Sequence, residues 1–254
     1  MSRSFERAFV VGMGEVGRRL AGALAAGGSE VVPVTRDGGW ERLARGVGPV
    51  LVCVREEALP STLARLGTVS PERLVFVQNG WVRPLLAGAP GCSRGLIWFT
   101  AKGEFFRVLR PSAFAGPVAS PLAAALARGG IAAEALDPAA FAAAEAEKMG
   151  FNCVVGLPLA VHCVSLAEYL GRHAAEAEAV FEEATAVTAR SLGVAPSAAW
   201  WPEFVRVAEP IGFVRVGAAK ALEFRNGAVV RLGREVGTAT PSNDALLGAA
   251  GYTV

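Results

Sequence analysis

The sequence has few of the residues that mark a zinc protein or a nucleic-acid binder. It has four cysteines and two histidines, and neither set has the spacing of zinc ligands. Basic and acidic residues almost balance, 25 against 23, and no basic run is long enough to follow a phosphate backbone. We therefore expect no metal centre and no nucleic-acid partner.

Long apolar runs are also missing. Charged residues interrupt the first apolar stretch, so the start does not read as a secretory signal. Segment 151–167 contains Asn152, Pro158 and His162 and falls short of the about 18 apolar residues of a membrane span. We expect a buried helix there and no membrane partner. Cys53, Cys153 and Cys163 lie in apolar runs typical of buried thiols, which fits a reducing cytoplasm.

Material for a large core is plentiful. Of 254 residues, 52% are hydrophobic and 19% charged, which is typical of one large or two small globular domains. Short Val/Leu runs alternate with Ala/Leu/Arg stretches of helical period. Continuous apolar runs are typical of parallel strands buried on both faces, so the alternation predicts an α/β, Rossmann-like doubly wound sheet. The predicted strands are 8–11, 30–34, 50–54, 74–77, 95–100, 106–109, 113–115 and 131–136, and the predicted helices are 14–26, 40–45, 59–66 and 121–128.

A second, all-helical domain is predicted to begin at Asp137. Aspartate is a favourable N-cap, and Pro138 suits the first helical turn. The sequence thus divides into a domain of residues 1–136 and a helical domain of residues 137–254. The helices expected in the second domain are 138–170, 173–192, 198–209 and 212–236, with stops at Gly193, Pro210 and Gly237.

A glycine-rich motif follows the first predicted strand and opens the first predicted helix. Gly12 permits a tight turn, Gly14 lets the backbone approach a pyrophosphate, and Gly17 lets helix and strand pack closely. Because the helix N-terminus offers unpaired N–H groups to an anion, the motif predicts dinucleotide binding. A glycine-rich turn with a purely structural role is the alternative. The segment expected to contact the cofactor consists of Gly12, Met13, Gly14, Glu15, Val16 and Gly17.

Arg36 follows the second predicted strand, where an NAD-specific site usually has an acid. A guanidinium group can hold phosphate oxygens in pairs, so Arg36 favours NADP, whose ribose carries a 2′-phosphate. The neighbouring Asp37 weakens this interpretation, and a solvated surface arginine is the alternative.

Lysine is rare: 22 of the 25 basic residues are arginine, and the lysines are Lys102, Lys148 and Lys220. A lysine amine can give up its proton, whereas arginine cannot. Lys148 lies in the predicted helix 138–170, and Asn152, four residues on, shares its face. We predict that Lys148 protonates a carbonyl oxygen as hydride reaches the carbonyl carbon. An incidental lysine is the alternative.

In order and spacing, these motifs and several later ones resemble the ketopantoate reductases (2-dehydropantoate 2-reductases) of the 6-phosphogluconate dehydrogenase-like group. The most specific part is K-x-x-x-N after a Rossmann domain, followed by E-x-x-N-G and TP-x-N. The resemblance rests on residues 12–17, 36, 51–55, 77–80, 148–153, 223, 226–227 and 237–243. It implies an NADPH-dependent reductase of a small 2-keto acid, with ketopantoate reduced to pantoate in pantothenate biosynthesis.

The resemblance also implies roles for single residues. Lys148 would be the proton donor, assisted by Glu223 as a second catalytic residue. Asn79 would hold the carbonyl and the nicotinamide, and Asn152 and Glu223 would bind polar groups of the substrate. Arg55 stands where the family has a lysine near the cofactor. Two alternatives stay open: Asn79 begins a good turn dipeptide, and Glu223 has cationic neighbours with which it would pair on a solvated face.

Two departures from the family concern the substrate side. Gly156 stands where the family has a substrate-binding asparagine, and Ile211 where it has a serine. Because both changes remove hydrogen bonds, a substrate other than ketopantoate is expected. Trp200, Trp201 and Phe213 indicate either a more apolar pocket or ordinary core packing.

Three functions therefore stay open: a 2-keto acid reductase, a related dehydrogenase acting on another carbonyl or an imine, and an NADP(H)-binding sensor without turnover. The apolar helical domain is compatible with a homodimer but does not require one.

Overall fold

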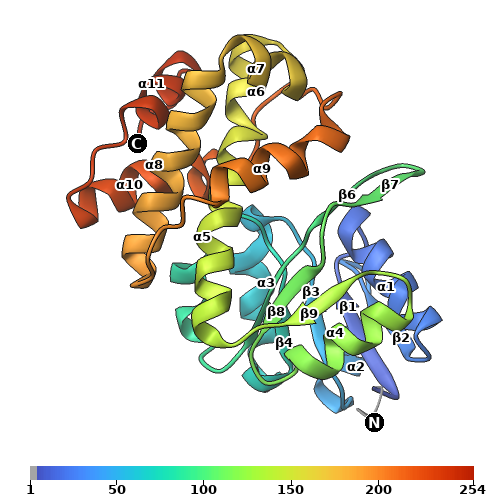
Figure 1. The fold of residues 1–254 in the computed structure, drawn as a ribbon. Helices are drawn as coiled ribbons and strands as arrows, with labels where there is room; N and C mark the ends of the chain where they lie inside the picture. Colours follow the sequence, from blue (N-terminus) through green and yellow to red (C-terminus); the bar gives the residue numbers. More distant parts are fainter. Residues whose placement is uncertain (1–4) are drawn as a thin grey trace. The chain divides into compact units, whose positions relative to one another are not determined.

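A computed structural model describes residues 5–254 (Figure 1). The first four residues of the predicted domain 1–136 lie outside the described part. The chain divides into two compact units. The first unit runs up to Gln78 and continues with Val82–Phe141, and the second contains Asn79–Trp81 and Ala142–Val254. The boundary between residues 136 and 137 stays a prediction.

The first unit is built on a seven-stranded sheet of order β2-β1-β3-β4-β5-β8-β9 (Figure 1). Strands β2 to β5 in this order run parallel, β8 pairs antiparallel with β5, and β9 pairs parallel with β8. All three residues of β3 are fully buried, as the continuous apolar runs predict. This confirms the doubly wound α/β sheet. The strands are β1 (Arg7–Val11), β2 (Glu30–Val34), β3 (Val50–Val52), β4 (Leu74–Phe76), β5 (Ser93–Leu96), β8 (Ser112–Ala115) and β9 (Ala133–Ala135).

Four α-helices accompany this sheet, and two of them, α1 and α4, pack directly on each other. Leu20 and Leu24 of α1 belong to the same core cluster as Leu122 and Leu126 of α4. The helices are α1 (Glu15–Ala26), α2 (Trp40–Arg45), α3 (Leu59–Leu66) and α4 (Ala119–Arg128), joined by the 3₁₀ turns Glu56–Ala58, Pro71–Arg73 and Arg83–Gly88. The first helix thus starts directly after β1, where the glycine motif lies.

The predicted strand 106–109 and the second half of the predicted strand 95–100 lie outside the main sheet. Strands β6 (Phe99–Lys102) and β7 (Phe105–Val108) form a separate antiparallel hairpin. The prediction of a single strand over 95–100 is therefore wrong, because the chain leaves β5 at Leu96 and begins β6 three residues later. The apolar residues continue across this break, so the sequence pattern does not show where one strand ends and the next begins. The hairpin turns at Gly103, whose φ of 59° lies in the left-handed region.

From α5 onward the chain is all-helical, as predicted (Figure 1). The α-helices are α5 (Pro138–Val154), α6 (Leu157–His162), α7 (Leu166–Arg172), α8 (Ala174–Leu192), α9 (Trp200–Ala208), α10 (Asn226–Val236) and α11 (Pro241–Ala249), and two 3₁₀ turns, η4 (Glu209–Ile211) and η5 (Leu222–Phe224), lie between α9 and α10.

The predicted helix 138–170 is wrong in its length, because the chain breaks into three helices there. Gly156 caps the start of α6, and Cys163 ends it in the left-handed conformation, with φ 55°. Ser165 then starts α7 with a reciprocal cap: its hydroxyl accepts the N–H of Glu168, and the Glu168 carboxylate accepts the N–H of Ser165. Cys163 is exposed rather than buried, which corrects the expectation for that thiol.

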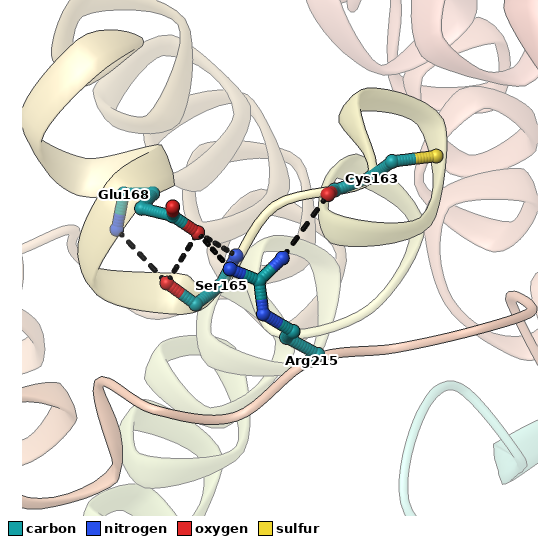
Figure 2. A network of polar contacts seen from close by, with 4 residues as sticks. All are labelled: Cys163, Ser165, Glu168 and Arg215. Carbon is teal, nitrogen blue, oxygen red and sulfur yellow. Dashed lines mark hydrogen bonds and ion pairs between the residues drawn. The ribbon is translucent and has the colours of Figure 1, made fainter.

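The start of α7 also anchors a distant loop (Figure 2). Arg215 donates to the Glu168 carboxylate at 2.6 Å and to the Cys163 carbonyl at 3.2 Å. Hydrogen bonds from Ser165 lower the pKa of Glu168, which keeps this carboxylate charged for the arginine. The predicted helix 212–236 is therefore wrong in its first half, because residues near Arg215 pair with Ser165 instead of forming a helix. Within this range only α10, from Asn226, is α-helical, and α11 was not predicted at all.

A buried polar network joins four helices of the second unit. The Asn226 amide donates to the Cys153 carbonyl at 3.3 Å and to the Asn243 side-chain oxygen at 2.9 Å. The Asn243 amide donates to the Glu183 carboxylate at 2.8 Å. That carboxylate also accepts the N–H groups of Ser242 and Asn243 in the first turn of α11. Asn226 and Asn243, two residues of the family-like motifs, therefore tie helices together.

The network predicts a large stability effect at Glu183. In Glu183→Ala, two helix N–H groups and a buried amide lose their acceptor, so we expect the free energy of unfolding to fall by about 2–3 kcal/mol. Urea denaturation followed by circular dichroism measures this. The neighbouring Glu182 is exposed, and Glu182→Ala is the matched control, with an expected change below about 0.5 kcal/mol. Equal effects of the two variants would contradict the role of the network.

Candidate functional site

The loop between β1 and α1 has no space for side chains at two of its glycines. Gly12 has φ 92°, and a Cβ there would lie 3.0 Å from Val54. A Cβ on Gly17 would lie 2.0 Å from the Gly12 carbonyl oxygen and 3.3 Å from the Cys53 side chain. Both glycines are therefore required by the close approach of α1 to the ends of β1 and β3.

Gly14 differs, because a Cβ there would meet nothing within 4 Å. It is the N-cap of α1, and no side chain of the described residues caps this helix end. The open space in front of a helix N-terminus is what a dinucleotide pyrophosphate requires, so the loop fits the group. Arg18 of α1 pairs with Glu15 at 2.7 Å and donates to the Met13 carbonyl, so it ties the loop to the helix. Val16 is half-buried.

Two arginines meet beyond the end of β2, through the side chain of one and the backbone carbonyl of the other. Arg36 is exposed there, and Arg65 at the end of α3 donates to its carbonyl at 3.5 Å. The Arg65 guanidinium also lies 3.8 Å from the centroid of the Trp40 ring, whose N–H donates to the Thr35 carbonyl at 2.6 Å. Arg65 was missed because only the fold brings its side chain to Arg36, 29 residues earlier in the chain. Asp37 is exposed next to Arg36.

Arg55 lies at the start of the turn that follows β3. It is exposed and caps the 3₁₀ turn that follows β3.

On α5, Lys148 and Asn152 are both buried, each 6% exposed. They lie one turn apart on one face, as predicted, and Gly156 follows four residues further on. The Lys148 ammonium lies 4.3 Å from the centroid of the Phe151 ring, three residues further along the helix. The face of the ring attracts the cation. Cation and amide therefore share a buried helix face.

An aromatic cluster packs against Phe151. Phe204 of α9 contacts Phe151 at 5.8 Å, Phe181 of α8 at 5.1 Å and Trp201 at 5.3 Å between ring centroids. Trp201 thus belongs to a packed cluster. The remaining unusual residues of this region differ in exposure: Trp200 is half-buried, Ile211 is buried and Phe213 is 62% exposed.

The segment after β4 contacts η5. The Trp81 N–H donates to the Phe224 carbonyl at 2.6 Å, and a Cβ on Gly80 would lie 2.2 Å from that oxygen. Gly80, with φ 78°, is required by this approach. Asn79 precedes Gly80, and Glu223 precedes Phe224. The contact therefore brings the segments that carry Asn79 and Glu223 next to each other.

Glu223 has an exposed side chain rather than one held in an apolar surrounding. Its backbone carbonyl accepts a hydrogen bond from the Arg231 guanidinium. The structure describes no ion pair between Glu223 and Lys220 or Arg225. Residues 12–17, 36 and 55 belong to the first unit, and Asn79, Lys148, Asn152 and Glu223 to the second.

Two of the cysteines have strongly shifted pKa values. Burial raises the pKa of both Cys53 and Cys153 to about 12, so these thiols are not nucleophiles at neutral pH. Across residues 5–254, His, Cys, Asp and Glu side chains do not gather in groups of three or more that would hold a metal ion. In the same range no helix has the length and apolar character to cross a membrane.

Comparison of the sequence with family models and with curated proteins finds no match. Comparison of the structure with solved structures does. A PanE/ApbA family ketopantoate reductase from Ralstonia eutropha JMP134 has TM-score 0.76 and 21% identity over 96% of this chain and 97% of its own. The 2-dehydropantoate 2-reductase from Methylococcus capsulatus has TM-score 0.72 and 18% identity over 95% and 94%.

The chain has the ketopantoate reductase fold. This confirms, at the level of the fold, the resemblance stated from the motifs. The same fold occurs in D-mandelate dehydrogenase, whose structure with NADH has TM-score 0.76 and 17% identity over 96% of this chain and 97% of its own. The fold alone therefore leaves the substrate open.

The glycine loop yields a matched pair of variants on α1. In Gly17→Ala the new Cβ clashes with the Gly12 carbonyl, so we expect a loss of stability of about 1–3 kcal/mol and weaker NADPH binding. Gly22 is exposed on the same helix with nothing within 4 Å of its Cβ position, and Gly22→Ala should stabilise by about 0.5–1 kcal/mol. Thermal denaturation and fluorescence titration with NADPH distinguish the two. NADPH bound equally well by both variants would contradict the role of the loop.

Proposed function

We propose that the protein is an NADPH-dependent reductase of a small 2-keto acid. The observation that carries the proposal is the face of α5 on which a buried lysine and a buried asparagine lie one turn apart. A buried ammonium is costly unless polar groups or a substrate compensate it. Its occurrence in a chain with a loop that fits a dinucleotide favours a catalytic role.

The first unit supplies the argument for the cofactor. The open N-terminus of α1 would hold the pyrophosphate, with Gly14 permitting close approach and residues 12–17 lining it. Arg36 and Arg65 favour NADPH over NADH. Arg36 is exposed directly after β2, the Arg65 guanidinium reaches the Arg36 carbonyl, and cations at this position suit a 2′-phosphate. Arg55 would contribute a further positive charge near the cofactor.

The chemistry divides between cofactor and chain. Reduced nicotinamide, when bound, supplies the hydride that the carbonyl carbon accepts. The Lys148 ammonium donates a hydrogen bond to the carbonyl oxygen and then its proton, so the oxygen becomes a hydroxyl and lysine a neutral amine that is reprotonated from water. Asn152 and Asn79 would orient the carbonyl by hydrogen bonds, and Glu223 would bind a polar group of the substrate.

Specific observations favour two other functions. Gly156 and Ile211 lack the hydrogen-bonding groups expected for ketopantoate, which favours a related dehydrogenase acting on another carbonyl or an imine. The exposed Glu223 favours an NADP(H)-binding sensor without turnover, because it leaves one expected catalytic group outside a buried site.

A dimeric ketopantoate reductase from Staphylococcus aureus has the same fold, so we also propose a homodimer, which light scattering would test.

Lys148 gives the central kinetic prediction. We expect Lys148→Ala to lower kcat with 2-keto acids at least about 100-fold, because the alanine cannot donate a proton. The dissociation constant for NADPH should stay unchanged. Lys220 is exposed, and Lys220→Ala is the matched control with full activity. NADPH oxidation over a panel of 2-keto acids measures both variants, and an active Lys148→Ala would remove this mechanism.

Arg36 and Arg65 give a prediction on cofactor choice. We expect Arg36→Ala and Arg65→Ala each to lower kcat/KM for NADPH about 10-fold or more and to leave NADH unaffected, since NADH lacks the 2′-phosphate. Arg45, exposed at the end of α2, serves as the control position. Parallel losses with both cofactors would show that these arginines do not select the phosphate.

A further inference from the structure

We propose that Arg225 binds the carboxylate of the substrate, in a space that Gly156 leaves open. This inference deepens the proposed function and rests on it for the identity of the carbonyl site. It assigns the group that replaces the hydrogen bonds lost at positions 156 and 211.

The first argument is proximity to the row of functional residues on α5. A Cβ on Gly156 would lie 3.7 Å from a terminal nitrogen of Arg225. The guanidinium therefore lies at the end of the series Lys148, Asn152 and Gly156, whose members are four residues apart. A larger side chain at Gly156 would occupy the space directly in front of Arg225.

The second argument is an unmet need for a hydrogen-bond acceptor. The Arg225 side-chain Nε is buried and has no hydrogen-bond partner among the described residues. A guanidinium carries five donors and no acceptor, and a buried donor left unpaired costs about 1–3 kcal/mol. The positive charge of Arg225 also acts on Cys153 of α5, where it opposes the rise in thiol pKa that burial causes. A carboxylate would supply both the acceptor and the opposite charge.

The third argument is that the backbone fixes Arg225 in place. Its N–H donates to the Leu222 carbonyl at 3.2 Å, and its carbonyl accepts the N–H of Val229 at 3.0 Å in the first turn of α10. The preceding residue, Phe224, holds the segment that carries Asn79 through the Trp81 N–H. Arg225 therefore lies between Gly156, just beyond the end of α5, and Phe224, which contacts the segment 79–81.

The chemistry of the proposed substrate matches this order. In a 2-keto acid the carboxylate is bonded directly to the carbonyl carbon, so the two groups bind side by side. An α-helix rises about 6 Å over four residues, so Asn152 lies about that far from Lys148 along α5, and the helix ends two residues before Gly156. With the carbonyl on Lys148 and Asn152, the proposal places the adjacent carboxylate toward Gly156 and Arg225. The guanidinium fork can take both carboxylate oxygens. Esters and simple ketones lack this anion and are expected to be poor ligands.

The test uses oxamate, an unreactive isostere of a small 2-keto acid, titrated by calorimetry into the whole protein with NADPH present. We expect Arg225→Gln to weaken oxamate binding at least about 30-fold, because a charged bidentate pair is lost, and Arg225→Lys to retain part of it. Arg234, exposed on the same helix, provides the control Arg234→Gln, with unchanged affinity. NADPH affinity should be unchanged in all three variants.

Gly156→Val supplies a second variant in case Arg225→Gln does not fold. Its side chain would fill the space in front of Arg225 and leave the guanidinium charge in place, although its Cβ would also lie 3.2 Å from the Asn152 carbonyl oxygen. We expect at least about a 10-fold loss of oxamate affinity. In steady-state assays, Arg225→Gln should raise KM for a 2-keto acid by a larger factor than KM for its methyl ester, which lacks the anion.

The outcomes separate this inference from the proposed function. Oxamate binding to the wild-type protein that depends on Arg225, without reduction of any 2-keto acid, would refute the reductase and keep the carboxylate site. Wild-type affinity for oxamate in a folded Arg225→Gln variant would overturn the inference. A wild-type protein that binds neither oxamate nor any 2-keto acid would also overturn it.

Discussion

The second unit is organised around one costly feature, a lysine ammonium buried on the inner face of α5. Removing a charge from water is unfavourable unless surrounding groups replace the water, so such a residue persists where a function requires it. The Phe151 ring supports the ammonium, and the aromatic cluster of α8 and α9 supports Phe151. The network of Asn226, Asn243 and Glu183 then fixes α5 through the Cys153 carbonyl.

The first unit is constrained by backbone approach instead of charge. Gly12 and Gly17 let α1 start directly against β1 and β3, and this leaves the helix N-terminus open at Gly14. Beyond the end of β2, the Arg65 guanidinium contacts the backbone carbonyl of the exposed Arg36. Each unit thus prepares one reactant: an anion site and a phosphate-selective pair for a dinucleotide, and a buried proton donor with a guanidinium beyond it for a keto acid.

Features that repeat along the chain were predictable, whereas features that depend on tertiary contact were not. Continuous Val runs predicted the parallel strands, and the glycine spacing predicted the loop before α1. The breaks around Gly156 and Cys163 and the late start of α10 were missed, because an apolar run reads the same across a turn. Arg65, Glu183 and Arg225 were missed for another reason. Each acquires its role from residues more than 25 positions away.

A crystal structure of the protein with NADPH and oxamate tests the central claim most directly. The account predicts the oxamate carbonyl oxygen at hydrogen-bonding distance, about 2.6–3.2 Å, from the Lys148 Nζ, with the carboxylate on the Arg225 guanidinium. Oxamate bound elsewhere, or a Lys148 ammonium that turns away from the ligand, would contradict it.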